Sequence, residues 1–531
     1  MRKLTSILML ALFGVLILVS SCNNDDPQSD APITFNANEA IPVTATLTVG
    51  QTLAVSGVEV TAEDGIESVS VTVNGNPVPA LDSNYVGGPT TAEYEFSVNT
   101  ADLGIGSYSV VFTAKDLNGS TTTFAHALTV QGIAYTVAVE TIDDNGTEDD
   151  PSDDIVFLEI SGSINFDYEF PTEGPEGQTI AYYVLGGRVK VTSGATLNIP
   201  AGSVIKGRSG TGSNATALLV ARGSKLMAEG SATAPIIFTS VDDEITIQQV
   251  EGGDFTSPNL DNDANGLWGG LIVLGYAPIS VNTATGEAQI EGIPTSDTDG
   301  LYGGDDKEDN SGIMRYISIR HGGTNIGSGN EINGLTLGGV GSGTTIENVE
   351  VVANQDDGIE WFGGTVDVSN ALVWNCADDA MDTDQAWNGT CSNFIVVTPL
   401  GGSAFELDGP EGTYIDGNHS FVNGTVYAGD QIDFLIDFDE NTNVDMSEIY
   451  FYGITTATVV SEYKLMSDAG NGTVARFEYS DIADASAVFV DIPAEELDEV
   501  ATNSNTVGPK DDTGFEWTWA SQSGGLAGIG L

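Results

Sequence analysis

The chain has 531 residues and a formal net charge of −62, from 77 acidic and 15 basic residues. This balance argues against nucleic acid as a partner, because phosphate binding needs clustered lysine and arginine side chains. A hydrophobic content of 40% argues against the disorder that a strongly acidic composition otherwise favours. The 65 glycines and the regular short apolar runs predict an all-β protein with many turns.

Residues 1–22 form a secretion signal, with Arg2 and Lys3, an apolar core and small residues before Cys22. The ending LVSSC resembles the lipobox of bacterial lipoproteins, which implies cleavage before Cys22 and acylation of its thiol. An ordinary signal peptide and a membrane anchor are the alternatives. The acids after Cys22 resemble the surface-export signal of Bacteroidota-type lipoproteins. This resemblance implies anchoring in outer-membrane lipid, with the protein facing the cell exterior, and residues 23–32 as a tether.

Residues 33–131 contain short runs that alternate apolar and polar residues, separated by NG and GG turns. This pattern predicts a β-sandwich. The segment DLGIGSYSVVFTAKDLNGS resembles the closing hairpin of bacterial immunoglobulin-like modules. The resemblance implies an N-terminal immunoglobulin-like domain that holds the next domain away from the membrane; a ligand-binding sandwich is the alternative.

Residues 132–179 are expected to hold an acidic linker and the start of the next domain. The stretch IDDNGTEDDPSDD is either a solvated linker or a hinge stiffened by Ca²⁺, which prefers oxygen ligands. From residue 180 to 531, apolar strands and Gly or Ser turns recur every 20–25 residues, which indicates a solenoid. VKVTSGATLNIPAGSVIKG resembles the first coils of right-handed parallel β-helix proteins.

The coils become explicit in IENVEVVANQDD, VSNALVWNCADD and CSNFIVVTPLGG. Aligning them predicts two stacked rows, one of inward apolar residues and one of asparagines at a turn. Stacked Asn side chains hydrogen-bond along such a row, and turns tolerate them. The apolar row is Val349, Ala371 and Phe394, and the polar row is Asn348, Asn370 and Asn393.

The same alignment stacks acidic residues. Asp356, Asp357 and Glu360 recur 22 residues later as Asp378, Asp379 and Asp382. We expect a column of Glu360, Asp382 and Glu406, a second column of Asp384 and Asp408, and the four other aspartates at the preceding corner. Stacked carboxylates repel one another. Salt can screen them, Ca²⁺ can bridge them, or one carboxyl group can stay protonated beside an ionised one, as in acid–base catalysis.

Tryptophans accompany these acids. Trp361 and Trp387 are expected in turns, where their faces could stack on sugar rings, and core packing is the alternative. Trp374 lies within a strand, which favours core packing. We therefore expect ligand binding by Asp356, Asp357, Glu360, Trp361, Asp378, Asp384, Asp408 and Trp387.

Two further sites follow from short patterns. Asp261, Asp263 and Asn265 begin like an EF-hand loop, but Ile272 stands where that loop needs a glutamate, which leaves a looser Ca²⁺ turn. Cys376 and Cys391 either form a disulfide or remain two buried thiols.

If the protein is an enzyme, Asp379, Asp382 and Glu406 are the catalytic candidates for a glycoside hydrolase or polysaccharide lyase. DDAMDTD loosely resembles part of the acidic motif of polygalacturonases, whose basic companion motifs are missing here. Lyases on this fold use Ca²⁺ with an Arg or Lys base, whereas Arg320 is expected in a strand away from the acidic turn.

The run DNSGIMRYISIRHGG and the coils after it resemble a family of secreted or lipid-anchored β-helix proteins from Bacteroidota, some labelled "multidrug transporter". The resemblance covers roughly residues 180–531 and implies a pectate-lyase-like fold and a surface location. We expect a lipoprotein that binds extracellular polysaccharide with help from Ca²⁺, and an outer-membrane uptake complex as a further partner. A carbohydrate-active enzyme and a non-catalytic scaffold or adhesin are the alternatives.

Overall fold

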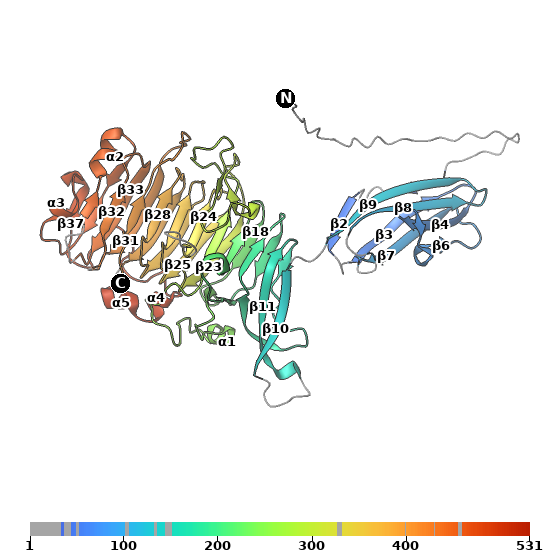
Figure 1. Cartoon of the computed structure of the whole chain (residues 1–531), viewed down its shortest axis with the longest axis horizontal. Coiled ribbons are helices and arrows are strands. Elements are labelled where there is room, and N and C mark those ends of the chain that lie inside the picture. The colour runs from blue at the N-terminus through green and yellow to red at the C-terminus, as the bar shows by residue number, and fades with distance from the viewer. Residues whose placement is uncertain are drawn as a thin grey trace, which may run out of the picture. The chain divides into compact units, whose positions relative to one another are not determined.

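The structure is a computed structural model that describes residues 33–36, 44–48, 52–100, 103, 106–131, 135–143, 151–325, 332–398, 400–429, 431–454 and 459–531. Two compact units divide the chain, Met1–Gly132 and Ile133–Leu531 (Figure 1). Cys22 and residues 23–32 lie outside the described residues, so the lipid anchor and the tether stay predictions. Within the described ranges, no helix has the length and apolar character needed to cross a membrane.

The first unit contains two sheets around one hydrophobic core, to which both contribute. Val60 comes from one sheet and Val71 and Phe112 from the other, and all three are buried. The assignment to the immunoglobulin-like class stays a prediction. One sheet has the order β1 (Thr34–Asn36), β3 (Thr52–Thr61) and β7 (Thr91–Asn99); the other has β2 (Thr44–Thr48), β9 (Thr121–Gln131), β8 (Gly106–Asp116), β4 (Ile66–Val73) and β5 (Asn76–Pro77), with β6 (Ser83–Asn84) beside β4.

The second unit is a parallel β-helix. Strand β10 (Tyr135–Asp143) pairs antiparallel with β11 (Ile155–Ile164), and β11 then pairs in parallel with the following coil. Parallel pairing therefore begins within residues 132–179. The early coils contain β12 (Tyr168–Glu169), β13 (Thr179–Leu185), β15 (Thr196–Ile199), β16 (Val204–Gly207), β18 (Lys225–Glu229) and β19 (Ile236–Ser240), with α1 (Ile247–Glu251) after them.

One face of the β-helix, here called the short-strand sheet, is built from one short strand per coil. Neighbouring strands pair in parallel throughout. The strands are β14 (Arg188–Val191), β17 (Ala217–Val220), β20 (Leu271–Leu274), β24 (Leu335–Gly338), β26 (Ile359–Phe362), β28 (Met381–Asp384), β30 (Phe405–Leu407), β32 (Phe434–Phe438) and β34 (Val459–Ser461).

A second face, the long-strand sheet, begins where β18 and β19 both pair with one longer strand, β23. Tyr316 bends β23 with a φ of 51°, between the parts that pair with β18 and β19. The strands are β23 (Gly312–Arg320), β25 (Thr345–Val352), β27 (Val368–Trp374), β29 (Thr390–Val397), β31 (His419–Tyr427) and β33 (Val444–Tyr452), followed by β35 (Thr473–Ala475), β36 (Phe477–Tyr479) and β37 (Leu497–Glu499). Helices α2 (Tyr463–Ala469) and α3 (Ala485–Val488) lie among these last strands in the sequence.

The predicted asparagine row is confirmed and is longer than expected. Each later Asn side chain donates to the one in the preceding coil, over 3.2 Å from Asn370 to Asn348, 2.7 Å from Asn393 to Asn370 and 3.0 Å from Asn423 to Asn393. All four have φ values of 56–60°, a left-handed conformation that asparagine tolerates better than most side chains. The predicted inward row Val349, Ala371 and Phe394 is also in register.

Replacing Asn370 with alanine is expected to lower the free energy of unfolding of the β-helix by about 1–3 kcal/mol. Alanine would lose two side-chain hydrogen bonds and would also place a Cβ in the left-handed region. Asn370→Gly removes the hydrogen bonds but keeps the backbone unstrained, so it should cost less. Urea unfolding of both variants checks this, and an equal cost for the two would contradict the backbone contribution.

The interior between the sheets is apolar, and it contains the two cysteines that were expected either to form a disulfide or to remain buried thiols. Cys376 and Cys391 are both free and fully buried in the core, so the disulfide does not form. Burial raises the pKa of both thiols, which keeps them protonated and unreactive.

Residues 275–311, here called the insert, separate β20 from β23 and cover part of the short-strand sheet. The insert contains the small hairpin of β21 (Ala288–Gln289) and β22 (Leu301–Tyr302). Its Ile279 and Ile293 pack with Leu219 and Ile272, which point outward from the sheet. The apolar outer face of the early coils is therefore buried beneath the insert, and Phe362 marks the edge of this cluster.

Residues 500–531, here called the C-terminal strap, contain α4 (Trp519–Gln522) and α5 (Gly525–Ile529) and lie against the outer side of the long-strand sheet. Trp519 and Leu526 pack with Val352, Leu372 and Ile395 in one buried cluster. The strap therefore gives the long-strand sheet a second, outer core.

Candidate functional site

The predicted column of Glu360, Asp382 and Glu406 is confirmed on the outer face of the short-strand sheet. Glu360 pairs in register with Asp382, Asp382 with Glu406, and Glu406 with Asp437. Ile359 and Trp361 belong to the core between the sheets, so strand alternation directs Glu360 outward. Consecutive strands lie about 4.8 Å apart, which gives the column its repeat.

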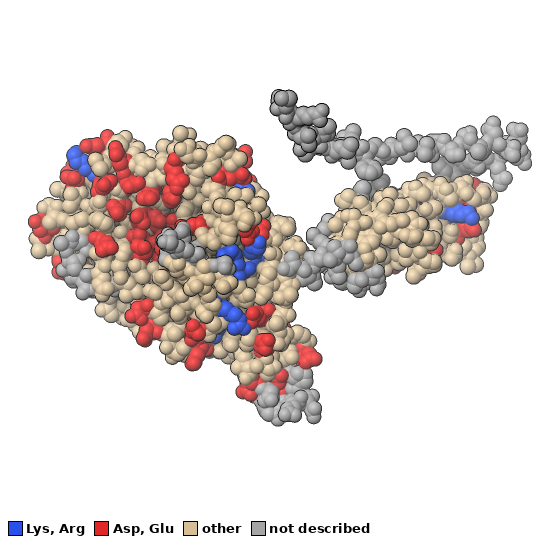
Figure 2. Space-filling model, in the orientation of Figure 1, with Lys and Arg blue, Asp and Glu red and all other residues tan. Residues whose placement is uncertain are grey.

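The acidic residues lie on the coils of the short-strand sheet that follow those covered by the insert. Figure 2 shows acidic side chains gathered on the β-helix around β28 and β32, with basic side chains to one side. A loop of residues 408–418 follows β30 and reaches the insert, where the Gly412 N–H donates to the Ser280 carbonyl over 3.1 Å. The acids therefore lie on a part of the sheet that is bordered by the insert and this loop.

Three of the carboxyl groups form a buried group. Ligand atoms of Asp357, Glu360 and Asp382 all lie within 4.8 Å of one another. Each residue is less than 9% exposed, and burial followed by neighbouring carboxylates raises the pKa of all three well above the usual range. Glu360 and Asp382 share a hydrogen bond, so one proton between them relieves part of the repulsion.

Among the described residues, the buried group has no basic partner, and one of its acceptors has no hydrogen bond. None of the ion pairs among the described residues involves its members. Asp382 Oδ1 is buried and accepts no hydrogen bond from any residue that the structure describes. Asn333, itself 1% exposed, donates to Glu360. An unsatisfied carboxylate oxygen in a desolvated position is costly, so this atom favours a ligand that can donate to it or coordinate it.

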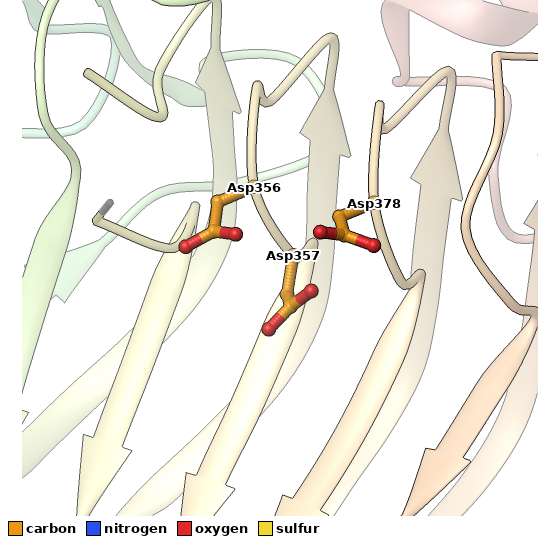
Figure 3. Close-up of side chains that lie close together, drawn as sticks. All are labelled: Asp356, Asp357 and Asp378. Atoms are coloured by element: carbon orange, nitrogen blue, oxygen red, sulfur yellow. The ribbon is translucent and has the colours of Figure 1, made fainter. Parts of the chain in front are cut away.

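The predicted corner is also formed, and part of it is structural. Asp356, Asp357 and Asp378 come within 4.8 Å of one another (Figure 3). Asp357 accepts the Asp379 N–H over 3.0 Å, and Asp379 accepts the Ser403 N–H over 2.5 Å. Each of these two carboxylates therefore fixes the turn of the next coil, a role that the sequence did not reveal.

The outer acids titrate at separate pH values. Burial and the nearby Glu411, Asp408 and Glu291 raise the pKa of Asp384 to about 7. Partial burial, and then a hydrogen bond with Asp379, raise the pKa of Glu406 to about 10. Partial burial and the charges of Asp439 and Asp437 raise the pKa of Asp408 to about 6.

The prediction that Trp361 and Trp387 present their faces to a ligand is wrong, and the alternative, core packing, is confirmed. Trp361 and Trp387 are both fully buried, and they stack on each other inside the β-helix with ring centroids 4.6 Å apart. Trp361 belongs to β26 and not to a turn, and strand alternation turns it inward from Glu360. Neither ring can stack on a sugar. Trp374 packs in a core as expected, but in the outer one beneath the strap, 6.0 Å from Trp519.

The expected Ca²⁺ turn gains no support. Asp261 and Asp263 are exposed and belong to neither acidic group that could hold a metal ion among the described residues. Their loop instead uses its backbone to contact the long-strand sheet: the Ala264 carbonyl lies 2.5 Å from His321 Nδ1, and the Asn262 carbonyl accepts from Asn375 over 2.8 Å. Asn265 lies in the same loop.

Arg320 lies away from the acidic face, as expected. It pairs in register with Val352 on the long-strand sheet and is 1% exposed beneath Trp519. It therefore cannot serve as a base at the acidic columns.

Sequence reasoning missed several neighbours of the site. Asp437 extends the first column, but the loop of residues 408–418 lengthens its coil to 31 residues and hides the repeat. Glu291 comes from the insert and Asn333 from the segment before β24, and no repeat marks either residue. The sequence IDF, which resembles FEL one coil earlier, was an available signal for Asp437.

Fold and site together define a parallel β-helix protein with a carboxylate-lined sheet. The chain belongs to the family of pectate-lyase-like β-helix domains, whose sequence profile matches residues 178–253 and 254–520. No curated protein matches the chain in sequence.

Solved structures with some similarity include three carbohydrate-active enzymes. The pectate lyase PelI of Erwinia chrysanthemi, solved with tetragalacturonic acid, is 9% identical over 85% of this chain and 100% of its own, with a TM-score of 0.17. The GH87 α-1,3-glucanase of Streptomyces thermodiastaticus is 12% identical over 85% and 87%, with a TM-score of 0.25. The family 28 exopolygalacturonase of Yersinia enterocolitica is 12% identical over 90% and 88%, with a TM-score of 0.17. At these values the likeness carries no functional conclusion.

Proposed function

We propose that this protein binds an extracellular polysaccharide along the acidic face of the short-strand sheet. The observation that carries the proposal is the register of Glu360, Asp382, Glu406 and Asp437, with Asp384 and Asp408 beside them. A row of acceptors repeated on successive coils suits a polymer better than a small molecule. Sugar hydroxyl groups donate strong hydrogen bonds to carboxylates.

A divalent cation is part of this proposal. Asp357, Glu360 and Asp382 offer only carboxylate oxygens, which is the donor chemistry that Ca²⁺ prefers. Their mutual repulsion, the lack of a basic partner and the unpaired Asp382 Oδ1 all favour a cation there. A bound Ca²⁺ would supply positive charge that lets these buried carboxyl groups ionise, and the three side chains would hold it.

The cellular setting of this proposal rests on the sequence. Cys22 in LVSSC would anchor the protein in the outer membrane with the β-helix facing the exterior. There the protein would present polysaccharide to an outer-membrane uptake complex. Metabolic labelling with a palmitate analogue tests the anchor, and Cys22→Ala is expected to remove the label and release the protein from membranes.

Neutralising the outer acids is expected to weaken polysaccharide binding at least tenfold. Asp384→Asn combined with Asp408→Asn removes two charged acceptors. Unlike Asp357 and Asp379, these two side chains accept no backbone hydrogen bond from the next coil among the described residues. Affinity electrophoresis against a panel of plant and algal polysaccharides measures the effect. The same substitution at the exposed Asp498 of β37 serves as the matched control and should change nothing. Unchanged retardation of the double variant would contradict the proposed face.

A second candidate function is glycoside hydrolysis at the same face. It is favoured by the separated pKa values of Asp384, about 7, and Glu406, about 10, because acid–base catalysis needs one protonated and one ionised carboxyl group. A reducing-end assay with the same polysaccharides tests it. Asp382→Asn should abolish turnover in an enzyme, whereas a binding protein shows no turnover to abolish. An ultraviolet absorbance assay for unsaturated sugar ends detects a lyase product instead.

A further inference from the structure

The β-helix begins with an edge strand. Among the described residues, β10 pairs only with β11, and Figure 1 shows it at the end of the β-helix opposite β37. The outer edge of β10 therefore presents backbone N–H and carbonyl groups that no neighbouring strand pairs. Edge strands commonly carry lysine or proline, which discourage pairing with another chain, and β10 contains neither. Its register with β11 is unbroken from Tyr135 to Thr141.

The inner side of β10 continues the core of the first coil. Tyr135 packs against that core. Val137 and Val139 follow on the same side of the strand, opposite the buried Ile160 and Leu158, because alternate residues of a strand share a side. Each of the two valines is nevertheless 39% exposed. The apolar interior of the β-helix therefore reaches the surface at this end.

The other end of the β-helix is built differently. Phe489, from the segment that follows α3, packs in the core against Phe451 and Phe477. The edge strand at that end is β37, and two of its three residues are exposed acids. Charged side chains on an edge strand oppose pairing with another chain. The β10 end, in contrast, combines a free backbone edge with exposed valines.

We propose that the β10 strands of two copies of this chain pair antiparallel and join two β-helices end to end. The two-fold axis passes at Ala138, because centring there pairs all seven residues of the regular stretch. Val137 then lies opposite Val139 of the partner subunit, so the exposed valines cover one another. Glu140 lies opposite Thr136 of the partner subunit, which avoids a pair of like charges. Such a two-fold contact uses the same surface on both copies and closes on itself.

A second copy suits this end better than a free peptide strand. A peptide could pair with the backbone edge, but it would leave the apolar interior of the first coil open, whereas another β-helix brings a matching apolar end. Charge also favours this contact. Six of the 15 basic residues lie within residues 188–225, in the coils near β10, while the acidic columns lie on later coils. Pairing through β10 therefore keeps the two acidic faces apart, beyond the range of strong repulsion in salt.

Analytical ultracentrifugation tests the association with the mature chain from Cys22, carrying Cys22→Ser to prevent lipidation. The expected result is a monomer–dimer equilibrium at concentrations up to about 100 μM. Val139→Lys is expected to raise the dissociation constant at least tenfold, because it places a charge in the apolar contact. Val490→Lys is the matched control and should change nothing, since Val490 is 38% exposed and lies outside β10. A chain that stays monomeric, or a dimer that Val139→Lys leaves unchanged, overturns the proposal.

Disulfide trapping tests the register. Opposite residues of an antiparallel pair have Cβ atoms about 4.5–5.5 Å apart, so Ala138→Cys should form a covalent dimer under mild oxidation. Thr136→Cys is the matched control on the same exposed side of β10. Its two copies would lie four residues apart, about 13 Å, which is too far for a disulfide. The buried Cys376 and Cys391 should not take part.

The trapping experiment also stands alone if Val139→Lys fails to fold, because Ala138 and Thr136 are exposed and tolerate small side chains. Thermal unfolding of each variant checks the fold. Equal trapping of the two cysteine variants, or none with Ala138→Cys, overturns the proposed pairing. The association goes beyond the proposed glycan binding, and neither result depends on the other.

Discussion

The β-helix is expected to unfold at a lower temperature at pH 8 than at pH 5 when divalent cations are removed. Burial raises the folded-state pKa values of Asp357, Glu360 and Asp382, and those of Asp384 and Glu406 to about 7 and about 10. Between about pH 4 and these values the folded protein binds more protons than the unfolded chain. The free energy of unfolding therefore falls as the pH rises through this window.

Differential scanning calorimetry in a chelator measures this effect, and we expect the β-helix transition to drop by roughly 5 °C or more from pH 5 to pH 8. Calcium should restore the loss at pH 8, by about 2.7 kcal/mol at a hundredfold excess over its dissociation constant. At pH 5 calcium should act less, because protons compete for the same oxygens.

Glu360→Gln combined with Asp382→Asn removes two of these five ionisable groups with little change in shape. This double variant should unfold at a temperature that depends less on pH and does not respond to calcium. A transition temperature that rises from pH 5 to pH 8 in the native chain would show that these carboxyl groups are not held protonated. An absent calcium response would remove the cation from the proposed function and leave the glycan face in place.

Replacing Glu350 with alanine is expected to lower the free energy of unfolding of the β-helix by about 3–5 kcal/mol. Glu350 and Arg320 are 0% and 1% exposed, and their charged atoms lie 3.7 Å apart. Ser318 links them, accepting from Arg320 Nε over 2.7 Å and donating to Glu350 over 2.5 Å. The Ala520 N–H of the strap donates to Glu350 over 2.9 Å. Alanine would leave the buried guanidinium without its paired carboxylate, and only the charges of Asp243 and Asp254 would still act on it.

Urea unfolding measures the loss, and limited proteolysis should show earlier cleavage within residues 500–531. Glu347→Ala is the matched control on the same strand, because Glu347 pairs with Arg315 at a half-exposed position and should contribute less than about 1 kcal/mol. The double replacement Arg320→Met with Glu350→Leu should recover most of the stability, since an apolar pair needs no desolvated charge. A cost for Glu350→Ala as small as that for Glu347→Ala would contradict this account.

The fold could be predicted from the sequence because successive coils of a solenoid repeat the same pattern of residue types. Val349, Ala371 and Phe394 share one position in successive coils, as do Asn348, Asn370 and Asn393, and each repetition reinforces the same register. The columns of Glu360, Asp382 and Glu406 followed from that register. Coil spacing alone was sufficient for these predictions.

The depth of each side chain could not be predicted in the same way. Coil spacing does not show where a strand begins. Trp361 follows the outward-facing Glu360 in the same strand and therefore points inward, whereas it was expected in a turn. The burial of Asp357 and Glu360 depends on neighbouring coils and on Asn333, and the insert covers part of the sheet without any repeat in its sequence. Contacts between segments that do not repeat leave no periodic signal.

The C-terminal strap has a consequence for the order of assembly. Its Ala520 contacts Glu350, 170 residues earlier, and its Trp519 and Leu526 cover Val352, Leu372 and Ile395. While a nascent chain emerges from a ribosome or a translocation pore, coils containing these residues can stack well before the strap is available. During that interval the hydrophobic outer surface of the long-strand sheet is exposed to water. Another incompletely folded copy could bind to it. A holding chaperone would be most useful to this protein during the delay between stacking of the middle coils and arrival of residues 515–526.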